Sequence, residues 1–158
     1  MGTKGKEIAE VDVEKLIAEL NKAFADEWLA YYQYWICAEI VEGPAARAIE
    51  GELKRIASEE LEHAEELATR IMQLGGRPLK NFREVLDKTG CGYQDPPEDP
   101  RDVKYILKIS IDGERCAIAA YSEILKMVHG KDPVTFQVIR HILEEEVEHE
   151  DTLERLMP

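Results

Sequence analysis

The stretches ELEH at residues 60–63 and EVEH at residues 146–149 share one spacing, a glutamate three residues before a histidine. Each stretch lies within a long segment whose apolar residues recur at helical spacing. Side chains three residues apart share one face of an α-helix, so each stretch presents a carboxylate beside an imidazole. The two stretches therefore predict two helices that each carry a pair of metal-ligand-type side chains.

Around these stretches the chain predicts an all-α fold, because no strand-like alternation interrupts the helical periodicity. We expect long helices at residues 12–41, 44–74, 102–128 and 132–158. Asp12 and Asp132 are good N-caps, and Pro133 suits the first turn of the last helix. The segment 75–101 is rich in glycine and proline and has room for a short helix at residues 81–87.

The connections between the four long helices are short, long and short. A short connection makes two helices antiparallel neighbours, whereas the long segment can carry the chain along the length of the bundle. This order predicts a four-helix bundle with a crossover between its second and third helices. The chain length suits one domain, which we expect over residues 1–158.

Polar residues fall on the apolar face of every expected helix, where an unpaired charge is costly to bury. Each helix contributes one glutamate, and the second and fourth helices add one histidine each: Glu27, Glu60, His63, Glu114, Glu146 and His149. Two divalent cations would offset four carboxylates, and mixed oxygen and nitrogen ligands suit iron or manganese. The sequence therefore predicts a di-metal site. Glu145 is the alternative to Glu146, which we favour because it alone has the three-residue spacing to His149.

The chain carries 33 acidic and 20 basic side chains, for a formal net charge of −13. This balance argues against binding to DNA or to a membrane surface, and it suits a protein that attracts cations. Lys4 and Lys6 are too few to reverse it. No apolar run approaches the roughly 20 residues of a membrane span, and residues 1–10 lack the apolar core of a signal peptide. We therefore expect a cytoplasmic protein.

Two tyrosines and three cysteines have several interpretations. Tyr34 and Tyr121 follow the glutamates of their own helices by seven residues, two turns along the same face. They suit hydrogen bonds to the ligand carboxylates or electron transfer, and core packing explains them equally well. Spacing alone leaves open whether Cys91 and Cys116 form a disulfide, and Cys37 is expected as a core thiol.

The chain resembles the ferritin-like superfamily, and in particular its bacterioferritin-type di-iron site, over residues 12–156. The likeness lies in NKAFADE (21–27), YYQY (31–34), EELEHA (59–64), GERCAI (113–118), which fits less tightly, and EEVEH (145–149). Within the superfamily the best match is the Dps-like group called thioferritins, whose subunits carry a cysteine pair near that site. Cys91 and Cys116 stand where such a pair would be.

The resemblance implies a hollow homo-oligomeric shell, of twelve subunits, that protects against oxidative stress. It implies oxidation of Fe(II) by hydrogen peroxide or O2 at an intrasubunit site of two iron ions, and storage of Fe(III) in the cavity. Glu60 and Glu146 would then bridge the two metals, Glu27 and Glu114 would be terminal ligands, and each histidine would bind one metal.

Three departures separate the chain from true bacterioferritins, and one of them is a longer crossover that holds Cys91. Leu61 stands where their haem-ligating methionine would be, so we expect no haem. The nine residues after His149 leave no room for the fifth helix of the larger cages. Three other functions stay open: a rubrerythrin-like peroxidase, although the chain has no four-cysteine rubredoxin site, a dimanganese catalase-like enzyme, and a metal-free structural bundle.

Overall fold

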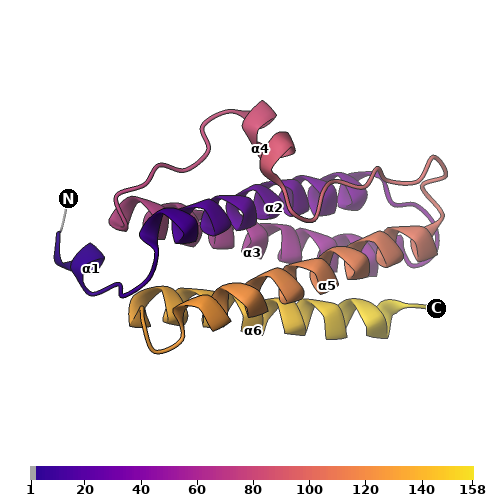
Figure 1. Cartoon of the computed structure of the whole chain (residues 1–158). Coiled ribbons are helices and arrows are strands. Elements are labelled where there is room, and N and C mark those ends of the chain that lie inside the picture. Colours follow the sequence, from indigo (N-terminus) through magenta and orange to yellow (C-terminus); the bar gives the residue numbers. More distant parts are fainter. Residues whose placement is uncertain (1–2) are drawn as a thin grey trace.

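The computed structural model describes residues 3–158, which form six helices (Figure 1). They are α1 (Lys4–Glu7), α2 (Val13–Ile40), α3 (Ala46–Gln73), α4 (Phe82–Lys88), α5 (Val103–Val128) and α6 (Pro133–Leu156). The four long helices and the short helix α4 begin and end within two residues of the predicted positions. Only α1 was not predicted, because a single turn is too short to show helical periodicity.

The helix ends follow from the residues that flank the helices. The N-cap side chains of α2, α4, α5 and α6 each accept a hydrogen bond from a backbone N–H of the first turn; they are Asp12, Asn81, Asp102 and Asp132. Helix α3 ends where Gly75 adopts a φ of 87°. The N–H groups of Gly75 and Gly76 then bond to the carbonyls of Met72 and Ile71, which is the Schellman arrangement.

The long helices form two antiparallel pairs that lie side by side (Figure 1). Helix α2 packs against α3, and α5 packs against α6. In the sequence, residues 74–102 connect the first pair to the second. This segment carries the chain from the end of α3 to the opposite end of the bundle, with α4 packed on the outside of α2 (Figure 1). The predicted crossover topology is therefore confirmed, and it brings one face of each long helix to a common interior.

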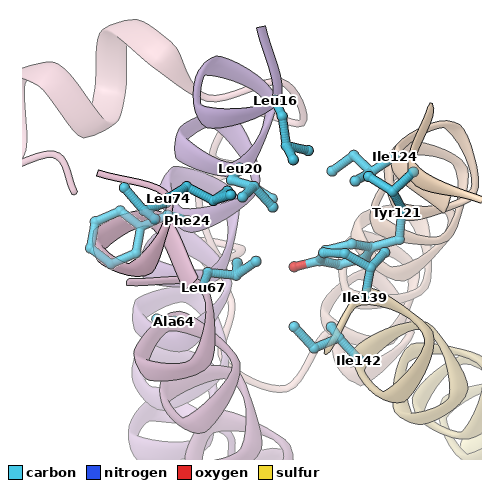
Figure 2. Close-up of a cluster of buried hydrophobic side chains, with 13 residues drawn as sticks. Leu16, Leu20, Phe24, Ala64, Leu67, Leu74, Tyr121, Ile124, Ile139 and Ile142 are labelled. Atoms are coloured by element: carbon cyan, nitrogen blue, oxygen red, sulfur yellow. The ribbon is translucent and has the colours of Figure 1, made fainter. Parts of the chain in front are cut away.

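Two clusters of buried apolar side chains occupy the two ends of this interior. The first contains Leu16, Leu20, Leu67, Ile71, Tyr121, Ile124, Ile139 and Ile142. The second contains Tyr34, Cys37, Leu53, Ile56, Ile106, Leu107 and Leu153. Figure 2 shows the first cluster, in which the hydroxyl of Tyr121 points away from its own helix into the bundle. The predicted polar positions lie between the two clusters along each helix.

A buried ion pair, not anticipated from the sequence, joins the two helix pairs at one end. The guanidinium of Arg70, on α3, donates to both carboxylate oxygens of Asp132 at 3.0 and 2.8 Å and to the hydroxyl of Thr135 at 2.7 Å. Asp132 also caps α6. The same carboxylate thus begins one helix and fixes it to the end of another.

Within residues 3–158, no helix is both long and apolar enough to cross a membrane.

Candidate metal centre

The structure brings together the six residues that helical phase selected. Their side chains are at most 3% exposed and form two overlapping groups. One group is Glu27, Glu60, His63 and Glu146, and the other is Glu60, Glu114, Glu146 and His149. Within each group the potential ligand atoms lie within 4.8 Å of one another. Two groups that share Glu60 and Glu146 have the layout of two adjacent cation positions with two bridging carboxylates.

Each histidine directs Nδ1 toward the carboxylates in the bundle. His63 Nδ1 lies 3.4 to 3.5 Å from oxygens of Glu27, Glu60 and Glu146. His149 Nδ1 lies 3.2 Å from Glu146, 3.4 Å from Glu60 and 3.7 Å from Glu114. Both rings therefore face a cluster of oxygen atoms with the nitrogen that would coordinate a cation.

The other ring nitrogen of each histidine faces outward and meets a carboxylate of the opposite helix. His63 Nε2 lies 2.7 Å from Glu145 Oε2, and His149 Nε2 lies 2.7 Å from Glu59 Oε2. A carboxylate at this distance holds the ring proton on Nε2, which leaves the Nδ1 lone pair free to bind a metal. The residue directly before each Glu-x-x-His pair thus orients the histidine of the other pair.

Four buried polar atoms of the six residues lack a hydrogen-bond partner among residues 3–158. They are Glu27 Oε2, Glu60 Oε1, His63 Nδ1 and Glu146 Oε1. An unpaired buried polar atom is costly, and carboxylates packed against one another also repel. All four atoms belong to residues of the two groups. A cation bound among these residues would give the atoms a partner and offset the repulsion between the carboxylates. The donor set of carboxylate oxygens and imidazole nitrogens fits iron or manganese.

Two tyrosines hold the carboxylates of Glu27 and Glu114 from across the bundle. The hydroxyl of Tyr34, on α2, donates to Glu114 Oε1 on α5. The hydroxyl of Tyr121, on α5, donates to Glu27 Oε1 on α2. Of the interpretations that the sequence left open, the hydrogen bond to a carboxylate is therefore present. The partner in each case is the glutamate of the other helix, and not the one seven residues earlier.

Burial and mutual repulsion change the protonation of the metal-free cluster. Burial raises the pKa of Glu60 well above its usual value, and the charge of Glu146 adds to this effect. Burial also raises the pKa of Glu114, and the charge of Glu146 raises it further. Burial disfavours the charged form of His63 and His149, but the neighbouring carboxylates outweigh it and raise the pKa of both imidazoles. Without a cation, these shifts favour the protonated forms of Glu60, Glu114, His63 and His149.

The crossover segment covers one side of the cluster and is tied to α2 beside Glu27. The Asp26 carboxylate accepts hydrogen bonds from the hydroxyl of Thr89 and from the N–H groups of Gly90 and Cys91, the latter two at 2.9 Å. A disulfide joins Cys91 to Cys116 of α5. Asp26 was not singled out from the sequence, because its partners lie on a loop whose path the sequence does not reveal.

A cavity of about 40 Å³ lies beneath this part of the crossover. Its walls include the carboxylates of all four ligand-type glutamates and, on the crossover side, Cys91 and Gly92. This volume has room for a few water-sized molecules. The cluster of carboxylates therefore borders a space that a small oxidant could occupy.

The remaining glutamates of the two stretches lie outside the cluster. Glu62 and Glu148 are exposed. Glu145, the alternative to Glu146, has a side chain that is 35% exposed and contacts His63 from outside, whereas Glu146 is 1% exposed. The sequence assigned no role to His141, whose Nε2 lies 3.8 Å from Glu145.

Comparisons with known proteins identify relatives of this chain. The DNA protection during starvation protein of Pyrococcus furiosus is 39% identical over 147 residues, which cover 93% of this chain and 79% of that protein. A bacterioferritin of Desulfovibrio desulfuricans is 34% identical, with 85% of this chain and 70% of that protein covered.

Among solved structures, a dodecameric thioferritin described as the bacterioferritin-related protein of Bacteroides fragilis superposes with a TM-score of 0.93. It is 38% identical and covers 98% of this chain and 92% of its own. A Dps homologue of Halobacterium salinarum, 24% identical with a TM-score of 0.85 over 92% of this chain and 81% of its own, shares the fold. The sequence model of the ferritin family, described as a ferritin-like domain, matches residues 17–157. The chain therefore belongs to the ferritin-like family.

Proposed function

We propose that this protein is a Dps-like ferroxidase that oxidises Fe(II) at the cluster and stores the Fe(III) in a homo-oligomeric shell. The observation that carries the proposal is the pair of inward-facing Nδ1 atoms, each fixed by a carboxylate at Nε2 and each aimed at three buried carboxylates. Such an arrangement is unfavourable without cations and complete with two of them.

In this proposal Glu60 and Glu146 bridge two Fe(II) ions, which are the substrate. Glu27 with His63 holds one ion, and Glu114 with His149 holds the other. Two adjacent Fe(II) ions supply the two electrons that reduce one hydrogen peroxide, with two protons, to two water molecules. The cavity beside the carboxylates admits the oxidant. O2 is the alternative oxidant.

The protein contributes order and a closed environment to this reaction. Tyr34 and Tyr121 hold the terminal carboxylates, and Glu59 and Glu145 hold the imidazoles, so the ligands do not have to be ordered when iron arrives. The apolar clusters at the two ends of the interior close the site along the bundle. We propose that no haem takes part, since Leu61 offers no ligand for one.

The shell is proposed from relatives and from charge. The Bacteroides fragilis thioferritin, which matches 98% of this chain, is dodecameric, and we propose twelve subunits here as well. A net charge of −13 on each chain would draw Fe(II) toward the assembly and favour mineral formation. The same charge opposes DNA binding. We also propose that the protein acts in the cytoplasm.

The test is anaerobic loading with Fe(II) followed by addition of hydrogen peroxide, with the oxidation rate followed by absorbance. Replacing Glu60 and His63 by alanine removes one bridge and one imidazole. The matched control replaces Glu62 and Glu148, which occupy the same two stretches but are exposed. We expect the first variant to oxidise Fe(II) more than about 100-fold more slowly, because loss of a ligand should cost more than loss of a residue that only supports a ligand. The control should keep the wild-type rate.

Equal rates in both variants would show that oxidation takes place elsewhere. Size-exclusion chromatography of the same reaction, with iron quantified across the peak, tests storage, because the proposal requires Fe(III) to elute with a large particle. If the particle binds manganese and does not bind iron, the proposal is wrong and the protein is a dimanganese enzyme.

A further inference from the structure

The two halves of the metal centre are nearly equivalent by construction. Each has a terminal glutamate that accepts from a tyrosine, and each has a histidine whose Nε2 meets a carboxylate of the opposite stretch at 2.7 Å. The halves differ in the residue one turn before that carboxylate. Arg55 precedes Glu59 by four residues, and His141 precedes Glu145 by four residues.

Arg55 binds closely to the carboxylate that supports His149. Its Nη1 donates to Glu59 Oε1 at 2.7 Å and to Glu59 Oε2 at 2.6 Å, and Oε2 is the oxygen that also meets His149 Nε2. The guanidinium further bonds to Glu52, which shares part of its charge. A permanent cation and the imidazole N–H therefore compete for the same oxygen.

The carboxylate that supports His63 has a weaker neighbour. His141 Nε2 lies 3.8 Å from Glu145 Oε2 and 3.5 Å from Glu66 Oε1, which is ion-pair proximity without a close hydrogen bond. The side chain of His141 is 46% exposed. Arg55 is a permanent cation that binds Glu59 closely, whereas the imidazole of His141 makes no close hydrogen bond to Glu145. The Glu59 oxygen that meets His149 is therefore shared with a cationic donor at 2.6 Å, whereas the Glu145 oxygen that meets His63 has its nearest other nitrogen, from His141, at 3.8 Å.

The charge on such a supporting carboxylate sets the basicity of the imidazole and its affinity for a metal. Arg55 withdraws charge from Glu59, so His149 Nδ1 is a poorer electron donor to a metal than His63 Nδ1. The positive charge of Arg55 also disfavours a metal cation nearby. We infer that the two metal positions are inequivalent: the position of Glu27 and His63 fills first, and Arg55 lowers the affinity of the position of Glu114 and His149. This inference rests on the proposed di-metal function.

The experiment uses the intact assembly with Co(II), which binds without oxidation. Crystals equilibrated with one Co(II) per subunit report the occupancy of each position by anomalous diffraction, and titration calorimetry reports both dissociation constants. The variants are Arg55→Gln, the matched control His141→Gln, and the exchange of Arg55→His with His141→Arg. Circular dichroism establishes that each variant remains helical.

In the wild type we expect the anomalous signal to concentrate beside His63. Arg55→Gln should tighten the weaker binding step by about 10-fold, whereas His141→Gln should leave that step unchanged. The exchange variant should move the preferred position beside His149.

Equal occupancy in the wild type, an unchanged order in the exchange variant, or weaker binding in Arg55→Gln would overturn the inference. The last result would mean that Arg55 acts mainly by ordering Glu59. A wild-type protein that binds no Co(II) inside the bundle would overturn the proposed function and the inference with it, so the two failures are distinguishable.

Discussion

Individual side chains of the cluster must exchange protons for cations. In the metal-free protein the pKa values of Glu60, Glu114, His63 and His149 are all raised, which favours the protonated forms of these groups. Metal ligands have to be deprotonated, so a cation displaces these protons.

Metal binding should therefore release protons, and the apparent affinity should rise with pH. The sign follows because each raised pKa favours the protonated form in the metal-free protein, and a rising pH favours the deprotonated ligand. Calorimetric titration with Co(II) in two buffers of different ionisation enthalpy measures the release. An affinity that stays constant between about pH 6 and pH 8, with no buffer dependence, would contradict the assigned protonation.

The residues that could be predicted from the sequence share one property. Glu27, Glu60, Glu114 and Glu146 are polar residues at apolar phase on a helix, and phase depends only on the chain itself. Glu59 and Glu145 lie beside them in the sequence, but their function depends on which helix faces which.

The same distinction applies to other residues outside the predicted set. Asp26 and Arg70 bind partners about sixty residues away, on segments whose approach the sequence does not specify. Neither residue breaks the local pattern of its helix in a way that marks its partner.

Among the helices, α6 depends most on a single capping residue. Asp132 accepts from the N–H groups of Val134 and Thr135 and from the buried guanidinium of Arg70. Asp102 caps α5 but is exposed and forms no ion pair with any residue of 3–158. The two residues therefore separate the effect of a cap from that of a buried ion pair.

Asp132→Ala should cost about 3 kcal/mol or more in the free energy of unfolding, because it leaves the charge of Arg70 buried and unpaired. Asp102→Ala, the control, should cost about 1 kcal/mol, the usual value for a lost cap. Chemical denaturation of the metal-free protein measures both. Similar losses in the two variants would mean that the Arg70 pair contributes little.

The same residue gives a pH dependence. Burial opposes the charged form of Asp132, but hydrogen bonds from Thr135 and Arg70 outweigh it and lower its pKa. A lowered pKa stabilises the folded state above the usual value of about 4, and this stabilisation is lost as the pH falls through the lowered pKa. In Asp132→Ala, this part of the acid sensitivity should be absent.

At the scale of the whole molecule, the bundle itself could be predicted well. Helix periodicity, the N-caps Asp12 and Asp132 and the glycines after α3 set the elements, and the short, long and short connections set their order. The path of residues 74–102 over the outside of α2 could not be predicted, since it depends on contacts such as that of Trp28 with Phe82. The shell depends on contacts between subunits, which a single chain does not show, so it is proposed from the assembly of a relative.

The proposed shell predicts a particle of twelve chains of 18.0 kDa each. Analytical ultracentrifugation of the metal-free protein should show one species of that mass, independent of concentration over a wide range. A monomer or dimer as the dominant species would contradict storage of iron in a cavity, although it would leave oxidation at the cluster intact.

The central claim is that the six buried residues hold two Fe(II) ions. Anomalous diffraction at the iron edge, on crystals loaded with excess Fe(II) without oxygen, tests it most directly. The account predicts two peaks in each subunit, one against Nδ1 of His63 and one against Nδ1 of His149, with Glu60 and Glu146 between them. Iron bound elsewhere on the particle, with an empty bundle interior, would contradict it.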